Sequence, residues 1–187
     1  LPEERILVYP NGTDTALFSE PVDQEAWRAK WGIAPNARLA LYVGKCYDWK
    51  GMEIFKDALR ALPDVTFAFV GCTKKEMQRI MHTDVPENTL FFGQRPYPEM
   101  PRWMKSADLL LVIGTKKNEY SYSQTSPMKL FEYMASGVPV LAPDTPAIRD
   151  MIPARHAFFY EADNAESFTE HIREALDDRP KALELAS

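Results

Sequence analysis

The chain has 187 residues, 45% of them hydrophobic, which suits one folded domain with its own core. Its formal net charge of −5 disfavours nucleic acid or an anionic membrane surface as the main partner. No apolar run approaches the roughly 20 residues of a membrane-spanning helix, and no secretory signal is recognisable. The composition therefore indicates one globular domain.

The cysteines and histidines give no metal-binding pattern. Cys46 and Cys72 form neither a zinc spacing nor a dense disulfide framework, which indicates thiols in a reducing, cytosolic setting. The three histidines are scattered without ligand spacing, so no metal site is expected. Cys46 as a nucleophile lacks a histidine in the same motif, and an idle thiol is the expectation.

Short apolar runs alternate with helical patterns along the chain. A β-like run at 5–9 is ended by a Pro-Asn-Gly turn signal. Later runs of strand length are apolar throughout, at about residues 39–43, 66–70, 89–92, 108–113, 138–142 and 158–160. Helical periodicity lies between and around them, at about residues 23–31, 52–62, 74–82, 98–106, 127–136 and 164–176.

This alternation predicts an α/β fold, a doubly wound parallel six-stranded Rossmann-like sheet covered by helices on both faces. In such sheets, ligands bind beyond the carboxyl ends of the strands, where the first and fourth strands lie side by side. The loops that follow those two strands are Gly44–Gly51 and Gly114–Thr125. Both loops are therefore expected to line one crevice.

The segment 126–142, SPMKLFEYMASGVPVLA, is the most informative part of the sequence. Ser126 is predicted to cap the helix N-terminus, with Pro127 at the first helical position and Gly137 at the end. An apolar face is predicted from the helical spacing of four residues: Met128, Phe131, Met134 and Ala135.

Lys129 is unexpected in the first turn, where the helix dipole disfavours a cation by up to about 1 kcal/mol. A bound anion held between this lysine and the free amides around Ser126–Met128 would explain it. Lys45 and Lys50, in the loop after the first strand, would bring the cations in the crevice to three, enough to hold a diphosphate. The alternative is that Lys129 is a solvated lysine on a packing helix.

Glu132 lies one turn beyond Lys129, and its carboxylate could accept hydrogen bonds from the two hydroxyls of a ribose. The alternative is a surface ion pair between Lys129 and Glu132. Tyr97 and Trp103 are candidates for a base pocket, although such aromatics are more often part of a core.

Other nucleotide and hydrolase motifs do not match. The segment after the first strand reads GKCYDWKG, which is neither the dinucleotide-binding G-x-G-x-x-G nor a phosphate-binding P-loop. Ser126 lacks the G-x-S-x-G turn of a serine nucleophile.

Taken together, these motifs resemble the C-terminal, donor-binding lobe of GT-B glycosyltransferases of the family-4 (group 1) retaining type. The matching segments extend over nearly the whole chain: PNGTD with Phe18, VGK…KG, FVG, FFGQ…MPRWMKSADLLLVI and SPMKLFEYMASGVPVLA. The last of these is the most specific.

The resemblance implies a nucleotide-diphosphate sugar donor, usually UDP- or GDP-linked, and transfer with retention that needs no metal or other cofactor. By matching position, Gly44, Lys45 and Lys50 would hold the diphosphate, and the two lysines together with Gln124 would act in catalysis. The helix N-terminus would assist through four residues: Ser126, Pro127, Met128 and Lys129. Glu132 would bind the ribose, while Gln94 and Tyr97 would frame the base.

One position departs from the family pattern. Members often carry a second glutamate eight residues before the ribose-binding one, contacting the donor sugar, and here that position is Gln124. An amide can hydrogen-bond a sugar hydroxyl but cannot stabilise positive charge as a carboxylate does. Glu119 is nearby but out of register.

The resemblance predicts a single nucleotide-sugar-binding domain over residues 1–187, cut from a longer two-lobe protein and inactive without its N-terminal lobe. Its expected partners are that lobe, the donor, and a glycan, lipid or small-molecule acceptor, with no nucleic acid. The expected location is cytoplasmic, with peripheral attachment to the inner face of the membrane as a further expectation. Two alternatives remain, a non-catalytic scaffold module and a lobe of a sugar-nucleotide epimerase.

Overall fold

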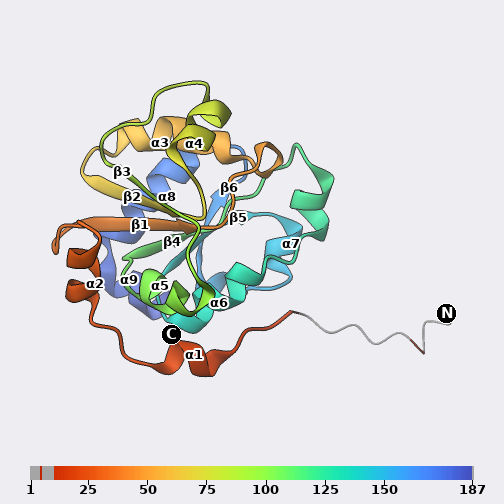
Figure 1. Ribbon diagram of the computed structural model, residues 1–187. Coiled ribbons are helices and arrows are strands. Elements are labelled where there is room, and N and C mark those ends of the chain that lie inside the picture. Colours follow the sequence, from red (N-terminus) through yellow and green to blue (C-terminus); the bar gives the residue numbers. More distant parts are fainter. Residues whose placement is uncertain (1–4, 6–10, 187) are drawn as a thin grey trace.

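The computed structural model describes residue 5 and residues 11–186, and it consists of a central sheet between two layers of helices (Figure 1). The predicted strand at 5–9 lies, apart from Arg5, outside the described residues. The chain enters the described part below the sheet, where α1 (Thr15–Ser19) lies against α6 (Met128–Ser136) (Figure 1).

All six predicted strands are present, and every neighbouring pair is parallel. They are β1 (Arg38–Val43), β2 (Val65–Val70), β3 (Thr89–Gly93), β4 (Leu109–Leu111), β5 (Val140–Asp144) and β6 (Phe158–Glu161). Their order is β3-β2-β1-β4-β5-β6, so the predicted doubly wound sheet is confirmed, with β1 and β4 side by side. β4 is shorter than predicted, and β5 begins two residues later than predicted.

The predicted helices are also present. The remaining α-helices are α2 (Gln24–Lys30), α3 (Phe55–Ala61), α4 (Lys74–Met81), α5 (Met100–Lys105), α7 (Pro146–Arg149), α8 (Ala165–Asp177) and α9 (Arg179–Leu185). Short 3₁₀ turns occupy Asp48–Lys50, Met52–Ile54, Tyr97–Glu99 and Ala154–His156, and a π-turn occupies Tyr120–Gln124. None of the described helices combines the length and the apolarity that crossing a bilayer requires.

The helices bury both faces of the sheet, which is why the strands are apolar throughout. Helices α3, α4, α8 and α9 pack with strand residues such as Tyr42 and Phe69 into one core. Helices α1, α2, α5, α6 and α7 pack with the alternate residues, such as Leu41 and Val70, into the other.

The amino ends of β1 and β4 are held by a buried arginine. Arg28 donates to the carboxylate of Asp108 at 2.8 Å and to the backbone carbonyl of Ser106 at 2.8 Å. The same carboxylate accepts the Leu39 amide at 2.9 Å. These contacts hold the amino ends of β1 and β4 together, beside a hollow of about 300 Å³ that Arg28 and Asp108 line.

The expectation of unpaired thiols is wrong, because Cys46 and Cys72 form a disulfide. Cys46 lies three residues after β1 and Cys72 two residues after β2, and these strands are neighbours, so the two Cα atoms are 5.5 Å apart. The sequence separation of 26 residues gives no signal of this contact. The pairing removes the cysteine-based argument for a reducing compartment.

Candidate functional site

A cleft of about 490 Å³ lies beyond the carboxyl ends of β1 and β4, where the sequence predicts the crevice. The loop after β1 contributes Gly44 and Lys50, and the loop after β4 contributes Gly114 and Ser121. The N-terminus of α6 forms the remaining wall. We call this the switch-point cleft.

Most predicted site residues line this cleft. They are Gly44, Lys50, Tyr97, Ser126, Pro127, Met128, Lys129 and Glu132. Lys45 and Gln94 instead line an adjoining hollow of about 180 Å³, which shares Gly44 with the cleft. Gln124 is exposed at the end of the π-turn and is a lining residue of neither. The predicted trio of cations in one pocket is therefore a pair, Lys50 and Lys129.

Helix α6 begins one residue later than predicted, and Ser126 is not its N-cap residue. Pro127 occupies the N-cap position and offers no side-chain acceptor to the first-turn amides. The Ser126 hydroxyl instead accepts a hydrogen bond from Asn11 at 3.1 Å. The uncapped helix end faces the cleft, as an anion-binding helix end does.

The predicted apolar face of α6 is correct only in part, because Met134 and Ala135 pack against the core while Met128 does not. The helix buries Leu130, Tyr133 and Ser136, whereas Met128 is exposed at the cleft. Apolar residues surround this helix on several sides, so their spacing alone does not define the buried face. Tyr133 anchors the helix to the sheet, because its hydroxyl accepts the Val43 amide at 2.9 Å at the end of β1.

Lys129 projects from α6 toward the end of β1. Its Nζ lies 3.9 Å from the centre of the Tyr42 ring, and a Cβ on Gly44 would be 3.3 Å from that nitrogen. Burial lowers the pKa of Lys129 well below its usual range, and the positive charge of Lys50 lowers it further, while Glu132 partly offsets this. The surroundings of Lys129 therefore disfavour its protonated form, and an anion bound beside it would favour that form.

Lys50 lies across the cleft from α6 in the loop after β1. Its Nζ is 4.9 Å from the ring centre of Tyr47 and 5.4 Å from that of Trp49. Desolvation by burial lowers the pKa of Lys50 as well. Two partly desolvated lysines beside an uncapped helix end make a site that favours a multiply charged anion.

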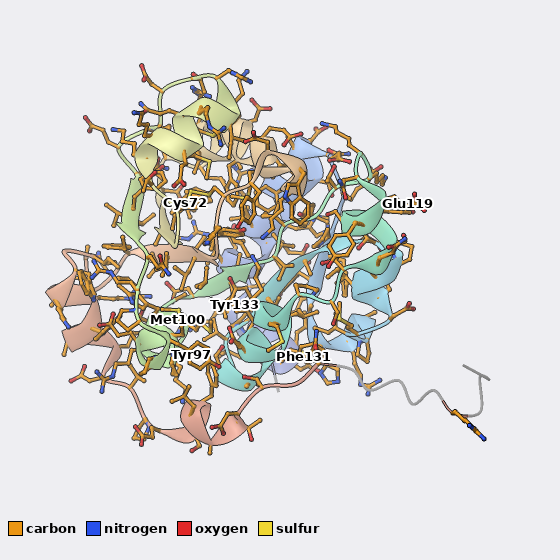
Figure 2. All side chains as sticks on the ribbon, turned by 45° about the vertical axis from the view of Figure 1, so that its right-hand side comes forward. Cys72, Tyr97, Met100, Glu119, Phe131 and Tyr133 are labelled. Atoms are coloured by element: carbon orange, nitrogen blue, oxygen red, sulfur yellow. A yellow bond between two sulfur atoms is a disulfide. The ribbon has the colours of Figure 1, made fainter. Side chains whose placement is uncertain are left out.

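Glu132 is 8% exposed, and so it belongs to the cleft wall and is not a solvated surface residue. Desolvation raises the pKa of Tyr97, and the neighbouring Glu132 carboxylate adds to the rise. Trp103 is a core residue packed on Trp27 at 5.5 Å, whereas Tyr97 is exposed in the cleft. Met100 and Tyr133, which Figure 2 labels together with Tyr97, belong to the same hydrophobic core.

Gly51 fixes how closely the Lys50 loop approaches the loop after β4. Its φ is +78°, and a Cβ there would lie 2.9 Å from the Cβ of Thr115. We expect Gly51→Ala to cost about 1–2 kcal/mol through the left-handed backbone alone, and to push Lys50 out of place. Urea denaturation measures the first effect, and an unchanged midpoint would contradict it. Gly12→Ala is a matched control, because a Cβ at Gly12 meets nothing within 4 Å.

Some residues of the site were missed in the sequence. Asn11 belongs to a recognised turn signal, but its contact with Ser126 spans 115 positions and leaves no local pattern. Trp49 and Tyr120 line the cleft from polar loops, where a single aromatic residue gives no periodicity. Within the described residues, no group of three or more His, Cys, Asp or Glu side chains could hold a metal ion.

Known proteins are similar to this chain in sequence over most of its length. It is 27% identical over 179 residues to the GDP-mannose-dependent monoacylated alpha-(1-6)-phosphatidylinositol monomannoside mannosyltransferase of Corynebacterium glutamicum, covering 90% of this chain and 46% of the relative. It is 23% identical over 186 residues to the lipopolysaccharide core biosynthesis mannosyltransferase LpsB of Rhizobium meliloti. This match covers 91% of this chain and 50% of LpsB. The chain thus spans about half the length of these relatives.

Solved structures share the fold. Alr3699/HepE of Anabaena in complex with UDP-glucose superposes with a TM-score of 0.77 at 24% identity, covering 95% of this chain and 49% of that one. The C-terminal domain of the group 1 glycosyl transferase LpcC of Francisella tularensis superposes with a TM-score of 0.72 at 20% identity. This match covers 94% of this chain and 93% of the LpcC domain. The Rossmann-like architecture expected of a GT-B C-terminal lobe is confirmed.

The family model described as glycosyl transferases group 1 matches residues 23–187, from the start of α2 through α9. The matched range includes both loops of the cleft and the whole of α6. The chain belongs to the group 1 glycosyl transferase family.

Proposed function

We propose that this chain is the donor-binding lobe of a retaining glycosyltransferase, which transfers a sugar from a nucleotide-diphosphate sugar to a glycan, lipid or small-molecule acceptor. The observation that carries the proposal is the convergence of Lys50, Lys129, Glu132 and the uncapped end of α6 in one cleft. The mannosyltransferase names of its relatives and the UDP-glucose complex of a structural neighbour support it.

The proposed chemistry follows from the charges in the cleft. Transfer breaks the bond between the anomeric carbon of the sugar and a diphosphate oxygen and forms a bond from that carbon to an acceptor hydroxyl oxygen, whose proton passes to the departing diphosphate. Negative charge develops on the diphosphate oxygen as its bond breaks. The ammonium groups of Lys50 and Lys129 and the amides of α6, which line the same cleft, would stabilise this charge. Glu132 would accept the ribose hydroxyls, and Tyr97 would lie beside the base.

Lys45 and Gln94 would act from the adjoining hollow, where the base end of the nucleotide and the outer side of the diphosphate would lie. Gln124 would reach the donor sugar only with movement of the exposed π-turn. Inactivity of the isolated lobe, binding without metal and a cytoplasmic location of the whole protein stay predictions.

The proposal is tested by calorimetric titration of the chain with UDP, GDP and ADP, with and without EDTA. We expect one nucleotide to bind, independently of EDTA, and Glu132→Ala and Glu132→Gln to weaken it at least about tenfold, through loss of charged hydrogen bonds. Glu170→Ala, at an exposed position of helix α8, is the matched control. Absence of binding by all three nucleotides would favour the scaffold alternative.

A further inference from the structure

The exposed apolar side chains of this protein gather at one place. In the part of the chain that the structure describes, the large hydrophobic side chains that are exposed are Tyr47, Trp49, Tyr97, Tyr120, Met128 and Leu183. Four of these line the switch-point cleft, and Tyr47 packs on one of them, which leaves only Leu183 elsewhere. Exposed apolar surface concentrated in a concave site marks a binding surface.

Three of these residues form a continuous surface that we call the aromatic shelf: Tyr47, Trp49 and Tyr120. Tyr47 and Trp49 are stacked, with ring centres 5.9 Å apart and planes inclined by 15°. Tyr120 meets Trp49 edge-on at 6.1 Å. Their side chains are 40%, 42% and 54% exposed. The shelf joins the loop after β1 to the π-turn after β4, so it is built by the fold and does not come from one flexible segment.

The shelf adjoins the cationic pair. The Nζ atom of Lys50 lies over both Tyr47 and Trp49, and Lys50 and Trp49 both line the cleft. Tyr97 and Glu132 are associated with each other at another part of the same cleft. Figure 2 shows Tyr97 well separated from Glu119, the residue before Tyr120. The cleft thus has aromatic surface in two separate places, and Lys50 lies against one of them.

We propose that the aromatic shelf is a subsite for a pyranose ring, an inference that rests on the proposed function. A pyranose presents a face of C–H groups that packs on an aromatic ring, while its hydroxyls stay at the rim in contact with water or polar groups. The shelf supplies such rings, and the hydroxyl tips of Tyr47 and Tyr120, with Lys50 and Ser121 close by, supply the polar rim. A lipid chain would leave these polar groups unpaired.

The position of Gln124 agrees with this assignment. Its amide is exposed and does not line the cleft, so it does not occupy the space beside the shelf. Apolar stacking on Trp49 and Tyr120 would then supply sugar binding at this part of the cleft. The ring could be the hexose of the donor or a sugar of the acceptor, and the two sources are separated by experiment.

The test compares Trp49→Ala and Trp49→Phe with the parent chain, and Leu183→Ala serves as an exposed control away from the cleft. Each variant is titrated with UDP, GDP and ADP and with UDP-glucose, GDP-mannose and ADP-glucose. The readout is the affinity for the sugar-linked nucleotide divided by the affinity for the free nucleotide. A variant that weakens binding of both ligands equally leaves this ratio unchanged. A second readout is acrylamide quenching of the tryptophan fluorescence that the parent has and Trp49→Phe lacks, in the presence of methyl glucoside or methyl mannoside.

For a donor sugar, the parent should bind one sugar nucleotide about two- to tenfold more tightly than its nucleotide. Trp49→Ala should lower that ratio to about one, while Trp49→Phe and Leu183→Ala keep it.

For an acceptor sugar, the ratio should not depend on Trp49, and a methyl hexoside should shield Trp49 from the quencher. If neither the ratio nor the shielding depends on Trp49, the proposal is wrong. Failure of all nucleotides to bind would overturn the proposed function alone, because the hexoside measurement still tests the shelf.

Discussion

Lys129→Met should weaken binding of the nucleoside diphosphate by about 10- to 100-fold and, at the same time, stabilise the empty domain. The loss of affinity follows because hydrogen bonds to charged groups contribute about 1.5–3 kcal/mol, and every 1.4 kcal/mol is a factor of ten. Lys129 faces the end of β1 beside the uncapped N-terminus of α6, where an anion would meet both. Calorimetric titration measures the change in affinity.

The gain in stability follows from the pKa of Lys129. In the folded, empty protein burial lowers this pKa well below its ordinary value of 10.5, and Lys50 lowers it further. Between the lowered and the ordinary pKa the unfolded chain binds more protons than the folded one, so the free energy of unfolding rises with pH there. At neutral pH the charge of Lys129 therefore destabilises the empty fold, and methionine fills similar space without that charge.

Thermal unfolding across neutral and alkaline pH separates the two effects. The parent's stability should rise with pH in that window more steeply than that of Lys129→Met. Lys129→Arg should keep most of the nucleotide affinity, and Lys56→Met, on the exposed side of α3, should change neither quantity. Parental nucleotide affinity in Lys129→Met would remove this lysine from the proposed site.

The fold was predictable because the information lies in local runs of residues. Six continuous apolar strands separated by helical periods define a parallel sheet, and the order of a doubly wound sheet places the ends of β1 and β4 together. That step alone located the crevice to which Lys50, Lys129 and Glu132 contribute.

The finer features of the site depend on contacts between distant residues. The Ser126 hydroxyl is engaged by Asn11 instead of capping its own helix, and no local rule chooses between these partners. The buried face of α6 is set by the bond of Tyr133 to Val43. Lys45 follows Gly44 directly, yet it lines the adjoining hollow, because the loop turns between it and Lys50.

The aromatic shelf was missed for a related reason. Tyr47, Trp49 and Tyr120 come from two polar loops about seventy positions apart, which only the parallel order of β1 and β4 brings together. The disulfide has the same origin, since Cys46 and Cys72 follow neighbouring strands. Sequence spacing thus predicts which loops meet but not which side chains in them touch.

Loss of the Cys46–Cys72 disulfide should lower the free energy of unfolding by about 2–4 kcal/mol, the usual range for a cross-link that closes a loop of this length. It should also weaken nucleotide binding. The bond ties the loop that carries Lys45 and Lys50 to the start of the loop after β2. There the backbones approach closely, since a Cβ on Gly71 would lie 3.0 Å from the Gly44 carbonyl carbon.

Urea denaturation and nucleotide titration should be made on the oxidised chain, on the chain reduced with a phosphine, and on the Cys46→Ala/Cys72→Ala double variant. A thiol count verifies each state. The reduced chain keeps both buried sulfur atoms, so its difference from the double variant isolates the cavity that the alanines leave. Equal stability of the oxidised and reduced chains would contradict the first expectation. A lower stability with unchanged nucleotide affinity would show that the remaining contacts of the Gly44–Gly51 loop hold Lys50 in place without the cross-link, and that the disulfide supports the sheet and not the site.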